Sequence, residues 1–161
     1  MTECCAPVAG AGCRGVHTRL VSRSEPLSVL VVGTDDWAVA QAQESLRVAG
    51  AVGLTCHEAG ESCFPCNALR DGRRCPLDAG AQVVLVVRAR PFPEPTSGET
   101  GAVCALHARL PLVTSGMGSN SPFARFADAE VSPSGDFVEA CERAVESRLE
   151  FVADISEKAL G

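Results

Sequence analysis

The 161-residue chain contains no apolar run that approaches the ~20 residues needed to cross a bilayer, which argues against a membrane-spanning helix. Its start lacks the basic and apolar stretches of a secretory signal peptide, because Glu3 stands where the apolar stretch would begin. Basic residues are also scarce: 14 lysines and arginines face 20 aspartates and glutamates, giving a net charge of -6. This acidic balance argues against a nucleic-acid binder that acts through overall charge. These absences predict a cytoplasmic protein that binds neither membranes nor nucleic acid.

Several catalytic signatures are missing as well. No Gly-Lys-Ser/Thr motif of a phosphate-binding loop occurs, and Gly33 is not followed by the further glycines of a dinucleotide fingerprint. His57 and His107 have no nearby nucleophile and acid with which to form a catalytic group. The sequence therefore favours a non-enzymatic protein, although it leaves an enzyme open.

Hydrophobic residues make up 46% of the chain, enough to form a proper core, and the length fits one domain. Residues 1–25 are rich in Ala, Gly, Pro and Cys without helical or strand periodicity, and predict a disordered tail. We expect a single domain over residues 26–155, with a cysteine-rich loop at 56–80 and a short C-terminal end at 156–161.

Apolar runs alternate with amphipathic stretches along this domain. The pattern predicts strands at 28–33, 51–56, 82–88, 112–114 and 129–131, and helices at 34–49, 98–109 and from 136 to about 152 or beyond. One helical turn is predicted at 67–70. Strands that are apolar throughout are typical of a parallel sheet buried on both faces. The predicted fold is an open α/β sandwich with a parallel sheet and helices on both faces.

The strand ends carry residues that resemble the receiver domain of bacterial response regulators. The resembling segments are 29–36 with the acidic pair Asp35 and Asp36, a hydroxyl at Thr114 or Ser115, and Val131-Ser132-Pro133 before the last helix. The resemblance covers roughly residues 27 to 150 and implies a receiver or flavodoxin-like three-layer sandwich.

Two departures from receivers concern phosphoryl transfer. Receivers accept the phosphoryl group on an Asp at the end of the third strand, whereas this strand ends in Arg88-Ala89-Arg90. They hold the phosphoryl oxygens with a Lys at the last strand, where this chain has Ser132. The resemblance therefore implies a degenerate receiver that does not accept phosphate, and the bare acidic pair would bind Mg²⁺ poorly.

The nine cysteines are most concentrated in the loop that replaces the second receiver helix. Cys63 and Cys66 form a C-x2-C turn, whose thiolates can reach one metal ion, and Cys75 could add a third ligand. Cys56 or His57 would complete a tetrahedral zinc site. Three close cysteines and a distant one equally suit an iron–sulfur cluster. Cys104 is such a distant candidate, and His107 lies one helical turn from it.

Two other interpretations of this loop remain open. Cys63 and Cys66 could form a redox dithiol, although a loop separates them from the preceding strand. Alternatively, the loop is an irregular surface segment with incidental thiols. Cys56, Cys104 and Cys141 are more often core residues than ligands, because free cysteine packs as a small apolar side chain.

A second candidate site lies at the carboxyl ends of the strands, where ligands bind in this architecture. Its residues are Arg88, Arg90, Gly116 and Gly118, the glycines belonging to a Gly/Ser loop whose N–H groups could hold an anion. The plainer interpretation is a solvated turn with the arginines paired to Asp35 or Asp36.

The sequence thus predicts a regulatory or interaction module whose cysteine loop binds zinc or an iron–sulfur cluster and senses metal or redox state. The alternative is a binder of an anionic small molecule, or an enzyme, at the strand ends. Because no output domain is recognisable, we expect a protein partner. A homodimer is compatible with this prediction.

Overall fold

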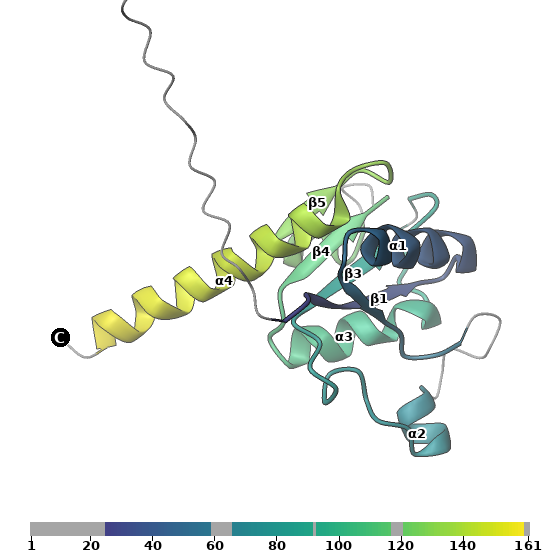
Figure 1. Cartoon of the computed structure of the whole chain (residues 1–161), viewed down its shortest axis with the longest axis horizontal. Coiled ribbons are helices and arrows are strands. Elements are labelled where there is room, and N and C mark those ends of the chain that lie inside the picture. The colour runs from purple at the N-terminus through teal and green to yellow at the C-terminus, as the bar shows by residue number, and fades with distance from the viewer. Residues whose placement is uncertain (1–24, 59–65, 92, 117–120, 160–161) are drawn as a thin grey trace, which may run out of the picture.

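A computed structural model describes residues 25–58, 66–91, 93–116 and 121–159, with side chains through Phe151 (Figure 1). The predicted disordered tail, up to residue 24, lies outside these residues. In chain order the elements are β1 (Ser28–Gly33), α1 (Asp36–Val48), β2 (Val52–Leu54), α2 (Asn67–Asp71), β3 (Val83–Val87), the 3-10 turn η1 (Ser97–Glu99), α3 (Thr100–His107), β4 (Leu112–Ser115), the 3-10 turn η2 (Ala124–Phe126), β5 (Ala129–Val131) and α4 (Phe137–Ala159).

The five strands form one parallel sheet in the order β2-β1-β3-β4-β5. This is the flavodoxin-like strand order, so the predicted fold class is confirmed. The central strand β3 is buried at every position, with no residue more than 3% exposed. Its unbroken Val and Leu run follows from this placement, because both faces of a parallel strand meet a helical layer.

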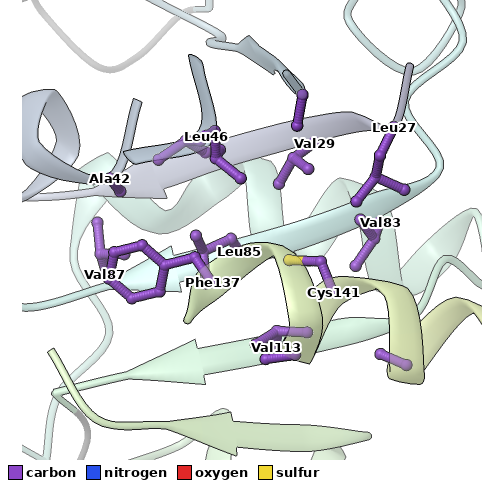
Figure 2. Close-up of a cluster of buried hydrophobic side chains, with 14 of the residues drawn as sticks. Leu27, Val29, Ala42, Leu46, Val83, Leu85, Val87, Val113, Phe137 and Cys141 are labelled. Atoms are coloured by element: carbon purple, nitrogen blue, oxygen red, sulfur yellow. The ribbon is translucent and has the colours of Figure 1, made fainter. Parts of the chain in front are cut away.

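Helices α1 and α4 cover one face of the sheet. Phe137 and Cys141 from α4 pack against strand residues such as Leu85 and Val113, and Leu46 from α1 joins the same cluster (Figure 2). Each of these side chains is at most 5% exposed. The C-terminal part of α4 projects beyond the sheet (Figure 1). None of the described helices is both long and apolar enough to span a membrane.

The other face is covered more thinly. Ala102 and Ala105 of α3 pack against Leu30, Val32 and neighbouring strand residues. In the described part of the segment between β2 and β3, the five-residue α2 is the one helix. Partly buried Cys56 and Leu77 from that segment pack against the α3-side core. The stretch between β2 and β3, residues 55–82, is called the cysteine segment below; its described residues contain one short helix where a full helix would complete this layer.

Most predicted elements are confirmed, with differences at their ends. Asp35 occupies the N-cap of α1, but its side chain makes no capping hydrogen bond. Asp136 does cap α4, since its carboxylate accepts from the Glu139 N–H at 3.0 Å. Strand β2 is shorter than predicted because this edge strand pairs with β1 only through Leu54. Helix α4 continues to Ala159 because no Gly or Pro interrupts it after residue 137.

A buried ion pair joins the end of β3 to the start of α3. Arg88 donates to Glu99 through Nε–H···Oε1 at 2.5 Å and Nη2–H···Oε2 at 2.8 Å, and both side chains are fully buried. The Arg88 Nη2 also donates to the Glu94 carbonyl oxygen at 3.0 Å. Glu99 Oε2 accepts in addition from the Thr96 N–H at 2.9 Å, as part of a capping box. One carboxylate thus anchors both the loop and the helix.

We expect Glu99→Ala to lower the free energy of unfolding by about 3–5 kcal/mol, because it leaves the Arg88 charge buried without a counter-ion. Denaturant unfolding of the full chain measures this. The matched control is Glu94→Ala, which also removes one negative charge but leaves the carbonyl that Arg88 uses. We expect the control to change stability by no more than about 0.5 kcal/mol. An equal loss in both variants would contradict a structural role for the ion pair.

Candidate functional site

Four cysteines from four places in the chain line one cavity of about 160 Å³. Cys56 follows β2, Cys66 directly precedes α2, Cys75 lies in the loop before β3, and Cys104 belongs to α3. Leu30 of the sheet also contributes to the wall. The cavity therefore lies between the irregular segment, α3 and the sheet, on the thinly covered face.

Backbone hydrogen bonds position Cys56 and Cys66, which lie between β2 and α2. The Cys56 carbonyl accepts from the Asn67 N–H at 3.0 Å, which ties the end of β2 to the start of α2. The Cys66 carbonyl accepts from the N–H groups of Leu69 and Arg70, so Cys66 is held by the single turn of α2. Cys56 and Cys66 therefore approach each other although nine residues separate them in the chain.

A tight turn positions Cys75. Its carbonyl accepts from the Ala79 N–H at 2.9 Å, and the Pro76 carbonyl accepts from the Ala81 N–H at 3.1 Å. Leu77 within this turn packs against the α3-side core. The turn thus attaches the end of the segment to the sheet and turns Cys75 toward the cavity that it lines.

Gly101 allows α3 to approach Cys56. A Cβ built at position 101 would lie 2.7 Å from Val32 Cγ1, closer than real Cβ atoms come, and a tight 3.0 Å from Cys56 Sγ. Cys104 follows three residues later, so it lies on the same helical face one turn further along. The close contact at Gly101 therefore brings the exposed Cys104 beside the segment.

The thiols interact electrostatically as one group. Burial raises the pKa of Cys56 to about 12, and the neighbouring thiols of Cys66, Cys75 and Cys104 add to this rise. Burial likewise raises the pKa of Cys104, with further contributions from Cys66 and Cys75. Negative charge on the neighbouring sulfurs thus disfavours the thiolate forms of Cys56 and Cys104.

Basic side chains stand at the same cavity. Arg73 and Arg74 both line it, and Arg73 also pairs with the exposed Glu58 at 3.0 Å. Arg74 donates to the Asp78 carbonyl at 2.5 Å. These guanidinium groups place positive charge beside a group of potential thiolates.

Of the predicted metal ligands, Cys56, His57, Cys66 and Cys75 all line this cavity. Cys63 lies outside the described residues. Within those residues, no three His, Cys, Asp or Glu side chains are grouped closely enough to hold one metal ion. The structure thus gathers most of the predicted ligands, together with the distant candidate Cys104, without arranging them around a single point.

The strand-end residues form a different arrangement from the predicted anion site. The guanidinium of Arg88 is buried against Glu99, whereas Arg90 is exposed. Gly116 has a φ of 70° and lies against the Arg88 carbonyl, so its close approach leaves no room for a side chain. Gly118 lies outside the described residues. Anion binding here stays a prediction, with Arg88 already held by a carboxylate.

Sequence reasoning missed Glu99 as the partner of Arg88 and named Asp35 or Asp36 instead. The spacing Thr96-x-x-Glu99 is a capping-box signature that could have drawn attention to Glu99. No local signal identifies the role of Gly101, because its neighbour Cys56 is distant in sequence.

Comparisons with known proteins agree with the fold and identify no relative in sequence. No protein-family model matches the chain, and no curated protein matches it. A solved structure in which a trimeric coiled coil of yeast Spc42 is fused to another protein shares 14% identity at a TM-score of 0.50, covering 84% of this chain and 90% of that one. An orphan response regulator of H. pylori shares 15% identity at a TM-score of 0.40, covering 76% and 96%. A response regulator from Burkholderia multivorans shares 16% sequence identity at a TM-score of 0.39, and the match covers 82% of this chain and 96% of that one.

These similarities are too remote to carry any activity to this chain. The sheet itself has five parallel strands in the flavodoxin-like order β2-β1-β3-β4-β5. The chain therefore has a flavodoxin-like α/β fold.

Proposed function

We propose that this chain is a regulatory module of receiver-like fold that does not accept a phosphoryl group and that uses its cysteine segment to bind a metal centre. Zinc or an iron–sulfur cluster would be the centre, and its loss or oxidation would be the signal. The observation that carries the proposal is the cavity lined by Cys56, Cys66, Cys75 and Cys104. A protein partner would receive the signal.

The thin layer on the α3 side supports this proposal. Long irregular segments are uncommon in compact domains unless they are functional or otherwise held. Metal binding can supply the folding free energy that a segment lacks when it buries little apolar surface. Here the described part of the segment contains one five-residue helix, and the thiols stand where it meets α3.

The buried ion pair supports the part of the proposal that says the chain does not accept a phosphoryl group. The position at which receivers accept phosphoryl holds Arg88, whose side chain is buried and bonded to Glu99. A cation that cannot be deprotonated provides no nucleophile. Ser132, at the position of the receiver lysine, is exposed and supplies no positive charge.

The metal proposal predicts near-stoichiometric zinc or iron in the full chain purified without oxygen. Cys66→Ala and Cys75→Ala should each lower the metal content at least about tenfold, because each removes a direct ligand. Elemental analysis and thiol titration measure this. Cys141→Ala is the matched control, since Cys141 is buried in the core on the α4 side and does not line the cavity. A wild-type chain with all nine thiols free and no metal would sink the proposal.

The phosphoryl proposal predicts that incubation with acetyl phosphate and Mg²⁺ leaves the intact mass of the chain unchanged. A receiver with its acceptor Asp serves as the positive control. Appearance of a species heavier by one phosphoryl group, stable enough to map to a residue at the strand ends, would contradict this part of the account.

A further inference from the structure

We propose that Cys104 of α3 joins Cys56, Cys66 and Cys75 as the fourth thiolate ligand of an iron–sulfur cluster, which thereby ties the cysteine segment to α3. This inference rests on the metal site proposed above. It adds the class of cofactor and a ligand from outside the segment.

The first argument is placement. Cys56 approaches α3 at Gly101, where a Cβ would lie a tight 3.0 Å from its Sγ. Cys104 lies one turn further on the same face and lines the same cavity as the other three thiols. Sets of four cysteine thiolates are the usual ligands of iron–sulfur clusters.

The second argument is the size of the space between the thiols. A zinc ion bonds sulfur at about 2.3 Å, which draws four sulfurs to within about 4 Å of one another. Within the described residues, no three His, Cys, Asp or Glu side chains are grouped closely enough to hold one metal ion, whereas four thiols are among the groups that line a cavity of about 160 Å³. A cavity of about 150 Å³ accommodates a guest as large as benzene. The space therefore suits a cluster of several atoms better than a single ion.

The third argument is charge. Four thiolates bring a negative charge that irons and nearby cations must offset, and cluster stability responds to such charge. Arg73 and Arg74 line the cavity from the segment. The exposed position of Cys104 leaves one side of the cavity near solvent, where oxidants can reach a cluster. Such access fits a sensor better than a permanently enclosed structural site.

The test compares the full chain purified without oxygen as wild type, Cys104→Ala and His57→Ala. His57 lines the same cavity and is the rival ligand beside Cys56, so its variant is the matched control. We expect broad visible absorption and stoichiometric iron and sulfide in the wild type and in His57→Ala. Cys104→Ala should lose at least about tenfold in iron and sulfide. Because Cys104 is exposed on a helix, alanine there should preserve the fold, which far-UV circular dichroism checks.

A second measurement needs no variant. In the wild type as purified, Cys104 should resist alkylation by iodoacetamide and should react once a chelator has removed the iron. Full retention of iron by Cys104→Ala, or equal alkylation of Cys104 before and after chelation, would overturn the inference. Zinc in place of iron would also overturn it while leaving the proposed metal site intact. Absence of any metal from the wild type would instead reject the proposed function itself.

Discussion

The buried ion pair between Arg88 and Glu99 is the constraint on which the rest of this structure depends. It connects the end of the central strand β3 with Glu99, the residue that directly precedes α3, in a place where neither charge meets water. Removing one partner would leave the other charge buried without a counter-ion, at a large cost in stability. The pair therefore fixes how α3 lies on the sheet. Under the proposed function, the same ion pair also occupies the strand end at which receivers carry their acceptor aspartate.

The placement of α3 determines what the cysteine segment can meet. Gly98 packs against the carbonyl of Gly33, and Gly101 one turn later lies against Cys56, so the helix starts tightly on β1. Cys104 then lines the same cavity as three thiols from the cysteine segment, whose described residues contain one five-residue helix. In this account a metal centre replaces the helix that would otherwise complete the layer. Its release would loosen the segment and change the surface around α3, which is how a partner could detect it.

The sequence was sufficient for the fold and for part of the site. Unbroken runs such as Val83–Val87 are local signals, and they correctly predicted a parallel sheet buried on both faces. The sequence predicted the ends of the elements less accurately. The length of β2, for example, depends on its pairing with β1 and not on its own residues. The partner of Arg88 was wrongly predicted, since Glu99 reaches it through a turn whose path the sequence does not specify. The grouping of Cys104 with Cys56 depends in the same way on how two distant elements pack.

X-ray absorption at the iron edge of the full chain, purified without oxygen, tests the central claim most directly. The account predicts a first shell made of sulfur alone, with scattering from neighbouring irons, as expected for a cluster held by four thiolates. A shell containing nitrogen or oxygen, or iron without an iron neighbour, would contradict it.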